Sequence, residues 1–238
     1  MAKLTETTLV ATDEKCMEVL KRCDATAEVT QYGAIPENSG MLITVSHGDN
    51  IGWLTEPRIS AYKQEINYVI IPYGQREKLE EIHELSAGKN VVFIPQFPIE
   101  ATDKSDYYLR CILEAEESIK ALIKLIKSDH EGIMAVTEED IAEVLSYGGN
   151  TYKAIFSVRR KSDSQRTEDL IDDVISHRLV CAKPVMALYK AFLPLECQFQ
   201  HIEKLDSAFE KSMGGVALDE CGQEVIIIAV YDKTPECT

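Results

Sequence analysis

The chain has 238 residues and a formal net charge of -15 at pH 7, with 45% hydrophobic and 27% charged residues. This composition is that of a globular protein with a buried core, and the length allows one large domain or two small ones. The negative charge argues against binding to nucleic acids or anionic lipid surfaces, since both present phosphates.

In its first part the chain alternates short apolar runs with amphipathic segments. Helices are expected at 13–23, with Thr12 as the N-terminal cap, and at 75–86. Strands are expected at 7–11, 41–45, 67–71 and 90–94. Near-continuous apolar strands that alternate with helices are typical of a mostly parallel sheet covered by helices, so the fold class is α/β.

The longest predicted helix, 105–127, carries isoleucine and leucine at helical spacing and charged residues on its other face. Thr137 and Asp140 have the spacing of a capping box, which predicts the start of a helix that continues to about Tyr147. Further helices are expected at 164–178 and at 199–213, the second ended by Gly214-Gly215. Strands are expected at 153–159, 184–191 and 224–231, the last in mid-sheet because it is so apolar.

The cysteines and the N-terminus indicate a reducing compartment. The seven cysteines are odd in number and include no Cys-x-x-Cys pair and no set with zinc-ligand spacing, so neither a disulfide framework nor a metal is expected. The start of the chain lacks the apolar run of a signal peptide, and no stretch approaches the ~18 apolar residues of a membrane span. We therefore expect a cytoplasmic protein. The basic run Arg159-Arg160-Lys161 is interpreted as a solvated strand end.

The order of segments from Asn90 onward, strand, long helix, loop and then alternating strands and helices, resembles the FtsZ/tubulin superfamily. Val91-Val92-Phe93-Ile94-Pro95-Gln96 is similar to the family strand that reads roughly I-V-I-P-N before the core helix. The segment 132–141, GIMAVTEEDI, resembles the loop that reads G-L-I-N-V-D-F-A-D-V in FtsZ. The segment 41–52, MLITVSHGDNIG, stands where the family has a strand followed by G-G-G-T-G-T-G. The run 8–13, TLVATD, looks like the family's second strand.

This resemblance implies a compact FtsZ/tubulin-like fold. A degenerate nucleotide-binding-like α/β domain would occupy 1–104, a central helix 105–127, and a smaller α+β domain with a mixed sheet 128–238. In the family, the loop after the core helix reaches the nucleotide of the next subunit and helps to position the attacking water.

Departures from the family pattern predict that GTP binding and hydrolysis are lost and that no cofactor is held. A glycine-rich loop works because bare backbone amides can surround phosphates. Here Gly48 and Gly52 remain, while Asp49 would repel a phosphate. The family's first strand and its first glycine-rich turn have no counterpart. In the second loop, Ala135 and Thr137 replace the family's asparagine and first acidic residue, and Asp140 persists.

The hypothesis is therefore a non-catalytic protein that assembles with itself or with an FtsZ-like protein, as a scaffold or regulator of a filament or cell-division assembly. Direct membrane insertion is not expected. Two loops on opposite faces are predicted to carry the contacts. One consists of His47, Gly48, Asp49, Asn50, Gly52 and Trp53. The other consists of Met134, Thr137, Glu138, Glu139 and Asp140.

Two alternatives remain open. The chain could be a small-molecule or nucleotide-binding α/β enzyme whose site is the 46–53 loop, since α/β sheets bind ligands at the carboxyl ends of their strands. Ser46-His47-Gly48-Asp49 could then be a hydrolytic site, although adjacent residues seldom give that geometry and no G-x-S-x-G elbow is present. The chain could also be a fragment that lacks an upstream strand, against which Met1 argues mildly.

Overall fold

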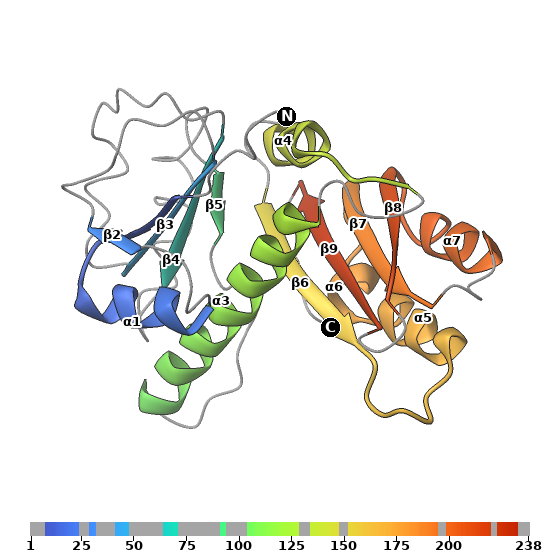
Figure 1. The fold of residues 1–238 in the computed structure, drawn as a ribbon, viewed down its shortest axis with the longest axis horizontal. Coiled ribbons are helices and arrows are strands. Elements are labelled where there is room, and N and C mark those ends of the chain that lie inside the picture. The colour runs from blue at the N-terminus through green and yellow to red at the C-terminus, as the bar shows by residue number, and fades with distance from the viewer. Residues whose placement is uncertain are drawn as a thin grey trace. The chain divides into compact units, whose positions relative to one another are not determined.

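The computed structural model describes residues 8–23, 29–31, 41–47, 64–70, 91–93, 104–128, 134–147, 152–194, 199–219 and 223–232 (Figure 1). The chain divides into two compact units, Met1–Lys120 and Ala121–Thr238, and the division falls within the long helix α3 (Lys104–Lys127). Each unit has its own β-sheet. Within the described part of the chain, no helix has the length and apolarity required to cross a membrane.

The first unit contains a five-stranded sheet in which every neighbouring pair of strands is parallel. Its order is β2-β1-β3-β4-β5, and the strands are β1 (Thr8–Ala11), β2 (Val29–Gln31), β3 (Met41–His47), β4 (Gln64–Ile70) and β5 (Val91–Phe93). The predicted parallel α/β arrangement is confirmed. The sequence reading missed β2, whose three residues are too few to show a pattern. The predicted helix 75–86 lies outside the described residues.

Helix α1 (Glu14–Cys23) joins β1 to β2 and buries one face, which carries Cys16, Val19 and Leu20. Its last turn is tied to α3, because Arg22 Nε donates to Glu116 Oε1 at 2.6 Å. Glu116 is only 6% exposed, so this ion pair compensates a largely buried carboxylate.

The second unit has a four-stranded mixed sheet in the order β6-β9-β7-β8. Strand β9 (Glu224–Tyr231) is antiparallel to both β6 (Tyr152–Arg159) and β7 (Met186–Leu193), whereas β7 and β8 (Ser212–Leu218) are parallel. Every residue of β7 and of β9 is buried, which confirms that the apolar run 224–231 lies in mid-sheet. The helices of this unit beyond α3 are α4 (Glu138–Ser146), α5 (Thr167–Ile175), α6 (Arg178–Cys181) and α7 (Phe199–Asp206).

Helices lie on both faces of this mixed sheet, as alternate residues of β7 show. On one face, Lys190 donates to the carbonyl oxygen of Ser128, just beyond α3, and Lys124 Nζ lies 4.1 Å from the centre of the Phe192 ring. On the other face, the hydroxyl of Tyr189 donates to Asp206 Oδ1 of α7 at 2.9 Å. A fully buried lysine at a helix C-terminus is stabilised by the carbonyl groups and by the dipole of that helix.

A buried carboxylate, Glu224, anchors the α3 side of the sheet. Lys124 Nζ donates to Glu224 Oε2 at 2.7 Å, and Arg159 Nε donates to Oε1 at 2.9 Å. Burial alone would raise the pKa of Glu224, but these two charged donors outweigh it and hold the pKa below its ordinary value.

Two helices predicted in this unit have other bounds in the structure. The helix expected at 164–178 is present as α5, over 167–175 only, and a separate helix, α6, begins at Arg178 after Ser176 and His177. The expected helix 199–213 ends at Asp206, and Gly214-Gly215 lies inside β8 rather than at a helix end. A Cβ on Gly214 would come within 2.4 Å of the Tyr189 ring, so the glycines here allow close approach of neighbouring groups to the strand.

Candidate functional site

The first unit has a topological switch point between β1 and β3. The chain runs from β1 through α1 to β2 on one side of β1, and β3 lies on the other side. In open α/β sheets this reversal, at the carboxyl ends of the strands, is where ligands bind. A ligand with a phosphate group would be expected to bind at this reversal.

The turn at this switch point, between β1 and α1, consists of only Thr12 and Asp13. The backbone N–H of Thr12 donates to the carbonyl oxygen of Val45 in β3 at 3.1 Å, and the Thr12 hydroxyl donates to the same oxygen at 3.2 Å. Two hydrogen bonds therefore hold the turn against β3. The turn contains no glycine, so it does not present the bare backbone that usually surrounds a phosphate.

Asp13 occupies the N-terminus of α1. Its Oδ1 accepts a hydrogen bond from the backbone N–H of Cys16 at 2.8 Å, which makes Asp13, and not Thr12 as expected, the capping residue. A helix N-terminus attracts anions through its free N–H groups and its dipole. Here a carboxylate of the chain itself takes that position. Burial first, and then the Asp13 charge, raise the pKa of the Cys16 thiol to about 12.

Of the first predicted loop, the structure describes only the backbone of His47, the last residue of β3, which pairs with Ile70 of β4. Gly48, Asp49, Asn50, Gly52 and Trp53 lie outside the described residues. Asp13 is a site residue that the sequence alone did not indicate. The sequence pattern that could have indicated it is the spacing of only two residues between a strand and the following helix. Such a turn is a candidate binding site only where the strand order reverses, and the sequence does not reveal the strand order.

The second predicted loop lies in the second unit, beside the edge strand β8. Met134 forms an isolated antiparallel bridge with Val216: Val216 N–H donates to Met134 O at 3.0 Å, and Met134 N–H donates to Val216 O at 3.4 Å. Val136 is buried, while Met134 is 41% exposed and Ala135 is also exposed. The segment is thus held against the sheet while two small or apolar residues face outward.

Thr137 and Asp140 form the predicted capping box at the start of α4. Asp140 Oδ2 accepts from the Thr137 backbone N–H at 2.7 Å and from its hydroxyl at 2.9 Å, and Asp140 N–H donates to Thr137 Oγ1 at 3.2 Å. Glu139 is exposed in the first turn of α4, which Glu138 begins. The structure therefore brings the five predicted residues together, and the geometry accounts for Asp140 as a helix cap.

Solved structures with the FtsZ/tubulin fold match this chain. CetZ from Methanosaeta thermophila aligns with a TM-score of 0.58 at 14% identity, over 84% of this chain and 63% of that one. FtsZ of M. jannaschii (a W319Y mutant) aligns with a TM-score of 0.56 at 16% identity, over 84% of this chain and 68% of that one. The chain has an FtsZ/tubulin-like fold.

A third match, to CetZ2 from Haloferax volcanii in a GTPγS-bound protofilament, has a TM-score of 0.54 at 15% identity and covers 92% of this chain and 71% of that one. These identities show the fold alone, and the chain spans less than two thirds of the Methanosaeta CetZ. No protein-family model and no curated protein matches the sequence.

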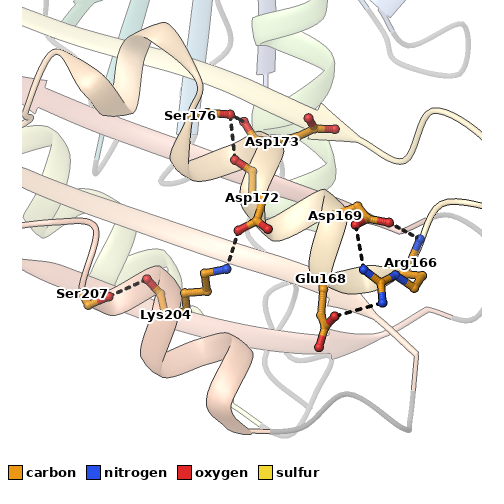
Figure 2. Close-up of polar contacts among 8 residues, drawn as sticks. All are labelled: Arg166, Glu168, Asp169, Asp172, Asp173, Ser176, Lys204 and Ser207. Carbon is orange, nitrogen blue, oxygen red and sulfur yellow. Dashed lines mark hydrogen bonds and ion pairs between the residues drawn. The ribbon is translucent and has the colours of Figure 1, made fainter.

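A polar cluster on the second unit of this FtsZ/tubulin-like chain lies on the outer surface of α5 and α7 (Figure 2). Arg166 donates to Asp169 at 3.3 Å and pairs with Glu168 at 3.5 Å, and Lys204 of α7 pairs with Asp172 of α5. Each of these acids thus has a cationic partner. Among the residues that the structure describes, no group of three or more His, Cys, Asp or Glu could hold a metal ion.

Proposed function

We propose that this chain is a non-catalytic FtsZ/tubulin-like protein that acts through protein–protein contacts and neither binds nor hydrolyses GTP. The observation that carries the proposal is the Asp13 carboxylate bound to the N-terminus of α1 at the switch point of the first sheet. A nucleotide phosphate placed there would have to displace this carboxylate or lie beside it.

The cost of that arrangement is at most about half of the roughly 8 kcal/mol that micromolar binding supplies. Asp13 is exposed, so two like charges about 4 Å apart repel there by about 1 kcal/mol if solvent screens them fully and by about 4 kcal/mol at an effective dielectric constant of 20. This range corresponds to a loss of affinity between roughly fivefold and roughly a thousandfold. The turn offers no glycine whose backbone could compensate with additional N–H donors. Asp49, predicted to lie in the loop after β3, would add to the repulsion.

The segment before α4 supports loss of hydrolysis. Ala135 has no polar side-chain atom, and the Thr137 hydroxyl and the Asp140 carboxylate bind each other. Both groups serve the helix start, so neither is positioned by the structure for a separate task such as orienting a water molecule. Glu139 beside them is exposed.

The surface beside that segment supports a role in contacts. Met134 and Leu218 are the large hydrophobic residues that stand out as exposed among the described residues, at 41% and 50%. Leu218 lies two residues beyond Val216, the bridge partner of Met134, and Glu139 and Glu143 of α4 are exposed. Apolar groups with a charged surround are typical of protein interfaces. Self-assembly, or pairing with an FtsZ-like protein in the cytoplasm, is the function this surface would serve.

Sedimentation velocity over a range of concentrations tests the proposal, with the wild type alone and mixed with an FtsZ-like polymer. Met134→Glu should weaken association by placing a charge in the apolar contact. Ser207→Glu, which adds the same charge at an exposed position after α7, should leave it unchanged. A wild type that associates with neither itself nor the polymer, or a Met134→Glu variant that associates normally, would refute this interface.

A further inference from the structure

The segment from the end of β6 to the start of α5 contains the basic run Arg159-Arg160-Lys161 and two serines that follow it. Arg159 ends β6, Arg160 and Lys161 follow, and then come Ser162 and Ser164, both exposed. The proposed function makes no use of this turn, which lies after the edge strand β6.

The contacts that shape the turn place a guanidinium beside Ser162. Arg160 Nε donates to the carbonyl oxygen of Ser162 at 2.7 Å, and its NH2 group lies 3.3 Å from Asp163 Oδ1. The Ser162 hydroxyl oxygen is 3.0 Å from the Ser164 hydroxyl oxygen.

The two serine hydroxyls lie at the surface, whereas the cations before them are paired: Arg160 with Asp163, Lys161 with Asp173 at 2.9 Å, and Arg159 with Glu224 at 2.9 Å. A binding partner that reads these cations must exchange the pairs for its own carboxylates. The exchange costs about 0–1 kcal/mol at an exposed pair and more at Arg159, because its partner Glu224 is buried.

We propose that Ser162 is a phosphorylation site for a serine/threonine kinase that selects basic residues before its acceptor. Kinases recognise substrates through charge patterns, and Ser162 follows three consecutive cations, Arg159 to Lys161. The kinase transfers the γ-phosphoryl group of ATP to Ser162 Oγ: the bond from Pγ to the bridging oxygen breaks, a bond from Pγ to Oγ forms, the hydroxyl proton passes to the base of the kinase, and ADP leaves.

Ser164 serves as an internal control for this selectivity. Ser164 is also exposed, but Ser162 and Asp163 directly precede it. The Asp163 carboxylate would repel the acidic pocket of a kinase that selects basic residues. The phosphate on Ser162 would pair with the guanidinium of Arg160. That guanidinium would then exchange the Asp163 carboxylate for a partner of higher charge.

Incubation of the full chain with the catalytic subunit of cyclic-AMP-dependent kinase and Mg·ATP tests the site. We expect one phosphoryl group per chain, located at Ser162 by peptide mass spectrometry, lost in Ser162→Ala and retained in Ser164→Ala. Arg160→Gln should lower kcat/KM at least tenfold, with an unchanged thermal unfolding curve. No incorporation, incorporation at another residue, or an Arg160→Gln variant phosphorylated as fast as the wild type would overturn the proposal.

Phosphorus NMR of the phosphorylated chain gives a second readout. A phosphoserine has a second pKa of about 6, and a neighbouring guanidinium lowers it. The signal of the native protein should therefore titrate at lower pH than that of the same protein in urea, and Arg160→Gln should remove the difference. Equal titration in the native and the unfolded protein would refute the contact with Arg160.

Discussion

Gly215 is the position at which a single methyl group would separate the segment before α4 from strand β8. A Cβ at this residue would lie 2.5 Å from Val136 Cγ2 and 2.8 Å from the carbonyl oxygen of Met134. The second contact is with backbone, which cannot rotate away as a side chain can. Gly215→Ala must therefore displace the Met134 segment or distort the strand.

The expected cost follows from two opposing effects. Overpacking of this kind costs about 1–3 kcal/mol, while replacing a strand glycine by alanine contributes about 0.5–1 kcal/mol in the stabilising direction. The net destabilisation is about 1–2 kcal/mol, and the two bridge hydrogen bonds to Val216 should weaken with it. At about 2–4 °C per kcal/mol for a chain of this size, Tm should fall by about 4 °C.

Urea unfolding followed by circular dichroism measures the free energy, and hydrogen exchange at the Val216 amide, which donates to Met134 O at 3.0 Å, reports on the bridge itself. Exchange should accelerate in Gly215→Ala. In a double-mutant cycle, Val136→Ala removes one of the two clashes, so the double variant should be more stable than the sum of the single effects predicts. A Gly215→Ala protein with wild-type stability and wild-type exchange at Val216 would refute this reasoning.

Three further predictions concern charged groups and thiols. Asp13→Ala should lower the free energy of unfolding, measured by urea unfolding, by about 1 kcal/mol because the α1 cap is lost. Asp13→Ser retains a capping oxygen and should lower it less. Equal losses in the two variants would contradict the capping role. The folded-state pKa of Glu224 lies below its ordinary value of 4.5, so its stabilising contribution is present at neutral pH and is lost as pH falls below 4.5 through the folded pKa. Wild-type stability should therefore decline more steeply on acidification than that of Glu224→Gln, and parallel acid-unfolding profiles would argue against it. Burial raises the pKa of Cys16 and of Cys23 to about 12. Iodoacetamide at pH 8 should therefore alkylate both at least tenfold more slowly than the exposed Cys181, with the rates measured by peptide mass spectrometry. Similar rates at the three thiols would show that Cys16 and Cys23 are accessible.

The sequence predicted those parts of the fold that local patterns determine. The capping box of Thr137 and Asp140 is confirmed because its geometry involves four consecutive residues. The run 224–231 is confirmed in mid-sheet, as expected for a strand that is apolar throughout because both of its faces are buried. The FtsZ/tubulin-like fold is also confirmed. It was predicted from the order of strands and helices along the chain, and these elements are recognisable from local patterns.

The predictions failed where distant residues determine the local structure. Gly214-Gly215 has the appearance of a helix stop, but the Tyr189 ring and the Met134 segment require small residues there, and these neighbours are brought in by the sheet. The position of Asp13 at the switch point could not be predicted either. Many helices begin with an aspartate, and this one lies at a candidate binding site only because β1 is between β2 and β3, where the strand order reverses.

The most direct test of the central claim is titration of the purified chain with a fluorescent GTP analogue, with and without magnesium. If the Asp13 carboxylate holds the N-terminus of α1 against phosphate, no saturable binding should be seen at micromolar concentrations in either condition. Micromolar binding would contradict the account, since it would show that this switch point still accepts a nucleotide.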